Sequence, residues 1–359
     1  MKKLYMMVSL LLAICLLTGC MGTPVVYYTN CTCPTGSHTP SQGAAPVEGA
    51  LKTGLFISTD ISGSKSTPGA DSTTEDYGYA DFALTIIAVL VDENGVIADC
   101  IIDGIATTVE FDGAGQIATD LTAPVLTKNE LGDDYGMVAW GGAIAEWDKQ
   151  AAALANYAIG KTVDALKNGA IDETGRAPAG SDLASSATIY LGGYVAGIEQ
   201  AVANAQYLGA EAGDDLKLAV ISSLGSSKSA DAENAGNAQL DVDVTALTLN
   251  DDIITSCAID SVQAKVAFDV SGAVTSDVSE PVLTKNQLGA AYNMVAWGGA
   301  KAEWNEQAAA FAKYVTGKTA AEVAGIAVAE GKPADADLAS SVTISIGGFQ
   351  KLIEKACKG

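Results

Sequence analysis

The chain is poor in histidine, in basic side chains and in long apolar runs. Its 359 residues include a single His, and 43 Asp and Glu outnumber 20 Lys and Arg, which gives a formal net charge of −23. A surface of that sign repels phosphate backbones, which argues against nucleic-acid binding. One His also excludes a His-rich metal site and a histidine acid–base pair at each of two sites.

The N-terminal segment is typical of an export signal. Lys2 and Lys3 precede an apolar stretch, residues 4–17, that is too short to span a bilayer comfortably. The stretch leads to Cys20 through Leu-Thr-Gly, which resembles the lipobox read by the bacterial lipoprotein signal peptidase. A buried apolar segment is the alternative. We expect residues 1–19 to be a lipoprotein signal peptide and Cys20 to carry diacylglycerol as a lipid anchor. Loss of the two Lys takes the mature charge to −25.

Residues 20–50 have the composition of a flexible tether, because Pro recurs among Thr, Ser, Gly and Ala. Cys31 and Cys33 lie in it, and with His38 they form a candidate ligand group that lacks further ligands, so we predict no metal site. Excluding the Cys of the signal peptide and the lipidated Cys20, five Cys remain, and an odd number argues against a full disulfide framework.

An internal duplication organises the rest of the chain. Residues 124–162 and 281–319 align without a gap, and 28 of the 39 positions are identical. A further match links the segment DLASSATIYLGG, which begins at Asp182, with DLASSVTISIGG, which begins at Asp337. We therefore predict two copies of one domain, the first over residues 51–210 and the second over 211–359, since a period of this length is not that of a solenoid.

Each copy is expected to form strands and then helices. Leu84–Asp103 and Thr245–Asp260 are apolar runs broken by turn residues, which predicts hairpins, with Cys100 and Cys257 as small core residues. After a loop we expect a helix, a short strand and a second helix. The fold class predicted is α+β, with two tandem copies of a mainly antiparallel sheet domain and flanking helices.

The first helix of each copy carries an apolar stripe with spacing of three or four residues. The stripe of the first copy, over residues 143–158, is Ile144, Trp147, Ala151, Leu154 and Ala158. That of the second copy is Trp304, Ala308, Phe311 and Val315. Gly160 and Gly317 are expected to end these helices. The second helices are expected over residues 195–203 and 352–357, and the two Trp are interpreted as core anchors.

Functional residues are sought among those that both copies retain. A Ser-His-Asp triad cannot be built twice from one His, and Asp133 and Asp134 of the first copy are Ala290 and Ala291 in the second, which excludes paired carboxylates. The candidate pairs that both copies keep are Lys128 and Lys285, Tyr135 and Tyr292, Met137 and Met294, and Trp140 and Trp297.

These residues fit two interpretations. The lysines offer a charge to a phosphate, the aromatic rings offer a face to a planar ligand, and Gly141-Gly142 and Gly298-Gly299 are expected to leave helix N-terminal amides open to an anion. The alternative is a rigid loop closed by an aromatic plug. The residues alone do not decide between them.

The segment from Asp182 to Thr188 resembles a motif of the FMN-binding domain found in Rnf and sodium-pumping quinone reductase subunits, Asp-x-x-Ser/Thr-Gly-Ala-Thr/Ser. The resemblance implies FMN joined to Thr188 through a phosphodiester made by an ApbE-like flavin transferase, and FMN on Thr343 of the second copy. The motif also includes Asp182 and Asp337, which are interpreted as orienting groups or as turn caps, and Ser185 and Ser340. Ser186, Ser341 and Val342 are bulkier than the family's residues, and we expect this bulk beside the acceptor to hinder the transferase, more so at Thr343, where two positions differ.

The layout of lipobox, tether and tandem copies is similar to that of flavinylated lipoproteins of Gram-positive bacteria (the PplA type). That resemblance implies a carrier on the cell surface, anchored to the outer face of the cytoplasmic membrane through lipid alone. It implies electrons accepted from a membrane quinone or NADH dehydrogenase system and passed to external acceptors such as ferric iron. A carrier is favoured over an enzyme with its own substrate. The alternatives are a non-redox surface lipoprotein that binds a ligand or partner, and non-covalent flavin binding.

Overall fold

Long strands form two antiparallel sheets in the computed structural model, which describes residues 49–67 and 76–358. The first sheet, in spatial order, is β1 (Lys52–Asp60), β2 (Gly78–Val91) and β3 (Ile97–Phe111). The second is β4 (Asp215–Ser223), β5 (Gly236–Asn250) and β6 (Ile253–Phe268). A small two-stranded sheet joins β7 (Val328–Ala329) to β8 (Lys332–Pro333). The α+β class with antiparallel sheets is confirmed. The expected signal peptide, Cys20, Cys31, Cys33 and His38 lie outside the described residues.

Both predicted hairpins are confirmed, and their turns have local causes. Between β2 and β3 the Asp92 carboxylate accepts hydrogen bonds from the amides of Asn94 and Val96, each at 2.8 Å, and Gly95 takes a φ of 77° that favours glycine. Between β5 and β6 the turn residue Asp251 has a φ of 51°, which Asp tolerates better than most side chains.

Short helices alternate with longer ones after each sheet. The first set is α2 (Lys128–Leu131), η1 (Gly132–Tyr135), α3 (Met137–Gly141), α4 (Trp147–Ala158), α5 (Val163–Ala170), η2 (Leu183–Ser185) and α6 (Gly192–Asn204). The second set is α7 (Lys285–Leu288), η3 (Gly289–Tyr292), α8 (Met294–Gly298), α9 (Trp304–Val315), α10 (Ala320–Ala324), α11 (Ala336–Ser341) and α12 (Gly347–Lys358). The order of elements is thus nearly the same in the two sets.

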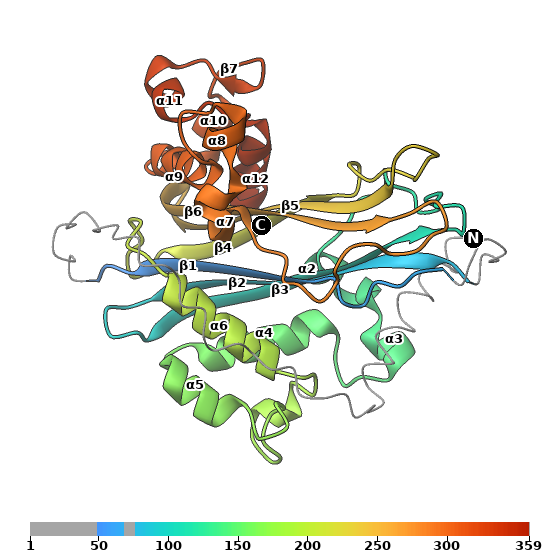
Figure 1. The fold of residues 1–359 in the computed structure, drawn as a ribbon. Helices are drawn as coiled ribbons and strands as arrows, with labels where there is room; N and C mark the ends of the chain where they lie inside the picture. Colours follow the sequence, from blue (N-terminus) through green and yellow to red (C-terminus); the bar gives the residue numbers. More distant parts are fainter. Residues whose placement is uncertain (1–48, 68–75, 359) are drawn as a thin grey trace. The chain divides into compact units, whose positions relative to one another are not determined.

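Each sheet is covered by helices on one face and meets the other sheet on its opposite face. α4 and α6 lie along β1–β3 with α5 packed against these two helices, and α9 and α12 lie along β4–β6 (Figure 1). Between the sheets one apolar core draws side chains from both, and the rings of Phe111 and Phe268 stack there with centroids 4.0 Å apart. Because this core is shared, the chain from Gly49 onward forms a single compact unit.

The predicted core anchors are confirmed. Trp147 is 3% exposed and Trp304 6%, and each ring meets an aromatic ring of the second long helix, Tyr194 or Phe349, edge to face. Cys100 and Cys257 are buried and unpaired, and burial raises the pKa of each thiol to about 12.

Some helix boundaries were predicted wrongly. α4 begins at Trp147 instead of residue 143, and Ile144, which was placed on its buried stripe, is 57% exposed. α6 begins at Gly192 and α12 at Gly347, earlier than expected. The short strand expected before the second helix does not form at Thr188–Leu191, which is irregular backbone.

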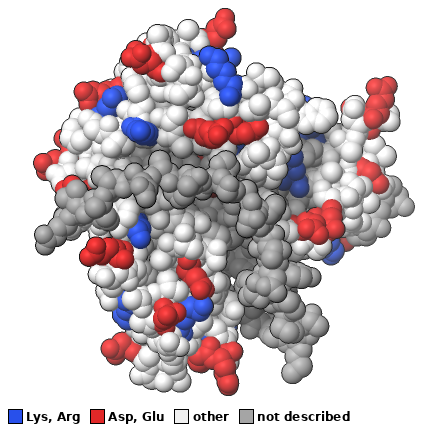
Figure 2. Space-filling model, turned by 60° about the vertical axis from the view of Figure 1, so that its left-hand side comes forward, with Lys and Arg blue, Asp and Glu red and all other residues white. Residues whose placement is uncertain are grey.

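The described helices are all too short or too polar to cross a membrane. Figure 2 shows acidic side chains scattered over one face with basic ones among them, so the negative charge is not gathered into one patch on that face.

Candidate functional site

The two candidate acceptor threonines occupy matching places, each four residues before a long helix. Thr188 lies between η2 and α6 and is exposed. Thr343 lies between α11 and α12 and is half-buried. The residue just before each threonine is buried: Ala187 is 1% exposed and Val342 0%. Val342 therefore packs into the core, whereas Ser186 and Ser341 are exposed beside the threonines, and hindrance of the transferase stays a prediction.

A buried glutamine holds each threonine. The Gln150 side-chain oxygen accepts hydrogen bonds from the Thr188 amide at 2.8 Å, the Thr188 hydroxyl at 3.3 Å and the Ile189 amide at 3.2 Å. Its Nε2 donates to the Ala145 carbonyl at 2.8 Å, and the side chain is fully buried. All its polar atoms are thus satisfied by the backbone and the threonine, which fixes the loop on α4.

The second copy repeats this arrangement. The Gln307 oxygen accepts from the Thr343 amide at 2.7 Å and from its hydroxyl at 3.0 Å, and Gln307 Nε2 donates to the Ala302 carbonyl at 2.8 Å. Since the hydroxyl proton of each threonine is donated to an amide oxygen, the lone pairs of Oγ1 are directed away from Gln.

A guanidinium lies at the first threonine. Arg176 donates from Nη1 to the Thr188 carbonyl, from a loop in which Gly175 accepts the Leu191 amide. In the second copy Gly331 accepts the Ile346 amide in the same way, and Lys332 follows it. Sequence reasoning missed this cation, because the two loops differ in length by one residue and the residue type is not retained.

One face of α4 holds several of these parts together. Glu146, at its N-cap, is buried, and its two carboxylate oxygens accept the Met137 amide at 2.8 Å and the Val138 amide at 2.9 Å, which fixes the start of α3. Glu303 does the same for Met294 and Val295. Glu146 and Gln150 are four residues apart, so they lie one turn apart on the same face. The repeated Glu-Trp-x-x-Gln spacing is the sequence signal for them.

The two candidate lysines lie against aromatic rings. Lys128 Nζ is 5.3 Å from the Tyr135 ring centroid and 4.8 Å from that of Trp147, and Lys285 has the same relation to Tyr292 and Trp304. Burial lowers the pKa of Lys128 to about 8, opposed by the carboxylates of Asp103 and Asp81, and it lowers the pKa of Lys285 as well.

The remaining retained side chains divide into packed and exposed ones. Tyr135, Met137, Tyr292 and Met294 are half-buried and pack against the core beneath the helices. Burial raises the pKa of Tyr135 to about 12, and the Tyr292 hydroxyl donates to Gln263 at 3.1 Å. Trp140 is 55% exposed and Trp297 87%, so these rings do not plug the loop and are open to a ligand or partner.

The polar residues of the Asp-x-x-Ser motif have local roles. The Ser185 and Ser340 hydroxyls donate to the Asp182 and Asp337 carbonyls at 2.6 and 2.7 Å, which closes a helical turn. Within the described residues the carboxylates of Asp182 and Asp337 make no hydrogen bond or ion pair. The structure thus places them beside the site without tying them to the threonine hydroxyls.

The glycine pairs were predicted wrongly. Gly141 ends α3, and Gly142 follows it with a φ of 62°, a left-handed conformation that stops the helix. Gly298 and Gly299 end α8 in the same way. These pairs therefore present helix C-termini, and the amides that start α3 are occupied by the Glu146 carboxylate.

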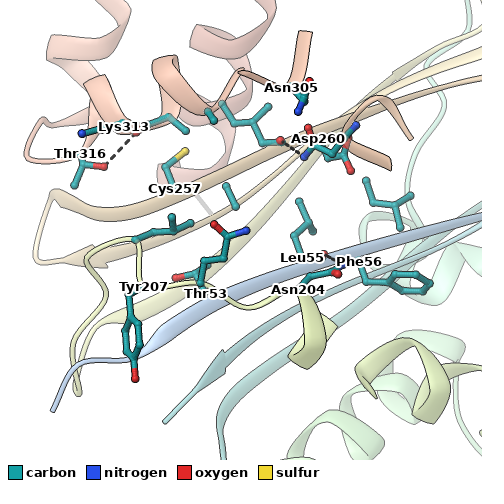
Figure 3. A pocket seen from close by; sticks show the side chains of 18 of the residues that line it. Thr53, Leu55, Phe56, Asn204, Tyr207, Cys257, Asp260, Asn305, Lys313 and Thr316 are labelled. Carbon is teal, nitrogen blue, oxygen red and sulfur yellow. Dashed lines mark hydrogen bonds between the residues drawn. The ribbon is translucent and has the colours of Figure 1, made fainter. Parts of the chain in front are cut away.

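A pocket of about 940 Å³ lies elsewhere in the described part of the chain. Thr53, Leu55 and Phe56 of β1 face Cys257 and Asp260 of β6 there, with α9 above them (Figure 3). None of the predicted site residues lines it. Asn305, Ala309 and Lys313 of α9 line it, whereas Gln307 lies on another face of that helix. A smaller pocket of about 290 Å³ occupies the equivalent place by β3 and α4.

Among the residues that the structure describes, no group of three or more His, Cys, Asp or Glu side chains is arranged to hold a metal ion. Comparison of the chain with protein-family models, curated proteins and solved structures gives no match.

Proposed function

We propose that the chain is a lipid-anchored flavoprotein electron carrier with FMN joined to Thr188 and Thr343. The main support is that both copies hold the threonine in the same way: its hydroxyl donates to the side-chain oxygen of a buried glutamine, at 3.3 Å in the first copy and 3.0 Å in the second. A hydroxyl that is held in a fixed position on a surface loop can serve as the attachment point for a group that a modifying enzyme transfers. The repetition indicates that the arrangement is kept for a reason beyond the packing of one loop.

The residues present fit a phosphodiester at this place. Gln150 and Gln307 orient Oγ1 so that its lone pairs point outward, and exposure of Thr188 leaves room for a modifying enzyme. The ester bond joins Oγ1 to phosphorus while a phosphorus–oxygen bond of the donor nucleotide breaks, for example that to the AMP half of FAD. The hydroxyl proton leaves to a base of the transferase, since an amide oxygen is too weak a base to keep it.

Bound FMN would supply the redox chemistry, and the chain would supply retention and surroundings. The exposed Trp140 and Trp297 offer ring faces. Tyr135, Met137 and Lys128 lie in the same helical segment as Trp140, and Tyr292, Met294 and Lys285 in that of Trp297. Covalent attachment prevents loss of a cofactor outside the cell. Two flavins on one chain relay electrons without any catalytic acid or base, which accords with one His in 359 residues.

The setting follows from the sequence pattern. Cys20 carries the lipid, residues 20–50 are the tether, and two copies of one domain bear the flavins on the outer face of the cytoplasmic membrane. A flavin transferase loads the chain, a membrane quinone or NADH dehydrogenase system reduces it, and acceptors such as ferric iron oxidise it. The mature charge of −25 favours cationic acceptors.

Intact-mass measurement after co-expression with a flavin transferase tests the proposal. The wild-type protein is expected to gain the mass of FMN less water at each acceptor, to be yellow, and to keep its colour after denaturation. Thr188→Val and Thr343→Val are each expected to lose one flavin. Ser185→Ala is a matched control, because that hydroxyl donates to a backbone carbonyl and is not an acceptor. Unmodified wild-type mass would reject covalent attachment, and colour released by denaturation would indicate bound but unlinked flavin.

The pocket by β1 and β6 favours a second candidate function. Its volume of about 940 Å³ is within the range of small-molecule sites, and amide groups of Asn204, Asn286 and Asn305 line it. A colourless protein whose thermal stability rises with a small ligand, and whose response is lost in Ala309→Trp, would identify a non-redox binding lipoprotein instead.

A further inference from the structure

The first acceptor site contains the chain's single arginine. Among 20 Lys and Arg, Arg176 is the sole Arg, and its guanidinium donates to the carbonyl of Thr188. Both the carbonyl oxygen and Oγ1 belong to the same threonine. A group attached to Oγ1 is therefore within reach of the guanidinium.

The charge of Arg176 is not neutralised by a neighbour. Within the described residues it forms no ion pair, although the chain is strongly acidic. The carboxylate of its own turn, Asp172, accepts from the amide and the hydroxyl of Thr174, at 2.8 and 2.6 Å. One of the five N–H donors of the guanidinium is used on Thr188, which leaves a planar edge of donors at the surface.

We propose that Arg176 is the phosphate ligand of the first site and makes the two sites unequal. A guanidinium matches two phosphate oxygens at once, whereas an ammonium acts as a single point charge. The second copy has Lys332 at the corresponding place, after Gly331. The site at Thr188 therefore binds and retains the phosphate of a flavin nucleotide better than the site at Thr343. This inference rests on the proposed function, since it assumes a flavin nucleotide at these threonines.

The first test uses unmodified protein made without a transferase, in a Lys332→Gln background. FMN and riboflavin are titrated against it by flavin fluorescence, because the two differ only in the phosphate. The Arg176 protein is expected to bind FMN about tenfold more tightly than riboflavin. Arg176→Gln keeps a donor for the Thr188 carbonyl and removes the charge, so it is expected to bind both equally. Equal binding of the two by the Arg176 protein would overturn the proposal.

The second test uses protein co-expressed with the transferase and measures flavin on each threonine by peptide mapping. Arg176→Gln is expected to lower occupancy at Thr188 severalfold and to leave Thr343 unchanged, and Lys332→Arg to raise occupancy at Thr343. Thermal melting checks that both variants fold. If wild-type protein carries no covalent flavin, the proposed attachment fails, while the preference for FMN over riboflavin still decides the role of Arg176. Unchanged occupancy at Thr188 in a folded Arg176→Gln protein would contradict it.

Discussion

A single buried side chain fixes each acceptor loop. Gln150 satisfies two amides, one hydroxyl and one carbonyl, so its removal leaves several part-buried polar groups without partners. Such a group costs about 1–3 kcal/mol when fully buried and less where water reaches it. Gln150→Leu, which keeps the size of the side chain, is expected to destabilise the protein by about 2–4 kcal/mol. Urea unfolding measures the change, and Gln200→Leu at an exposed position of α6 is the control. A loss below that of the control would show that water replaces Gln150.

Asp260 gives the protein a pH dependence. Its buried carboxylate accepts the Asn286 and Ser261 amides, yet burial raises its pKa from 3.8 to about 6, against the opposing charge of Lys285. The folded state thus favours the protonated form. This contribution to stability is fully present below pH 3.8 and is lost as the pH rises to about 6, by about 3 kcal/mol in all.

Asp260→Asn removes that titration and keeps an oxygen acceptor. The free energy of unfolding of the variant, relative to wild type, is expected to rise between about pH 4 and pH 6.5 and to be constant above that range. Denaturant unfolding across this pH range measures the difference. The contributions of the other carboxylates with raised pKa are the same in both proteins and cancel. A difference independent of pH would show that Asp260 titrates normally.

At the scale of elements, the local sequence pattern predicted the strands and helices but not the boundaries that are set by contacts with other elements. The hairpins, the apolar stripes and the two Trp anchors follow from spacing within one segment. The start of α4 does not, because Glu146 leaves the helix to hold the amides of α3. Retention between copies does not by itself indicate function, since Thr127 is retained as Thr284 and its hydroxyl accepts the Glu130 amide in a capping box. Arg176 escaped the same criterion because only one copy has it.

The contact of α6 with β1 depends on a glycine. A Cβ at Gly54 would lie 2.1 Å from the Ala201 carbonyl oxygen, so the helix would have to move away from the sheet. Gly54→Ala is expected to cost at least about 2 kcal/mol. Gly193→Ala, in α6 with no atom within 4 Å of its Cβ, is the matched control and is expected to stabilise by up to about 1 kcal/mol. Thermal unfolding compares the two, and equal effects would refute the close approach.

At the scale of the whole molecule, each copy has a core beneath its own helices, but the two sheets also share a core that joins the copies. Val220, Leu240 and Val262 of the second sheet pack with Ile57, Phe82 and other residues of the first. Backbone bonds also join the halves, from Ala230 to Gly115 and from Thr67 to Gly272. The halves are therefore expected to unfold in one transition, although their sequences align as copies. The sequence pattern did not predict the shared core. An apolar sheet face packs equally well against helices or against another sheet, so the pattern of one strand does not show which layer covers it.

Separating the halves tests that dependence. Residues 213–358 alone would expose the face that carries Phe268, Leu240 and Val262, all at most 1% exposed in the full chain. Such a face is too apolar to remain in water, so the fragment is expected to pair with a second copy of itself or to aggregate. Light scattering after size-exclusion chromatography measures its mass. The full-length Phe268→Ala variant, expected to lose about 3–5 kcal/mol with a single transition, is the companion measurement. A stable monomeric fragment would show that each copy folds as its own domain, and the flavin sites would then be separable units.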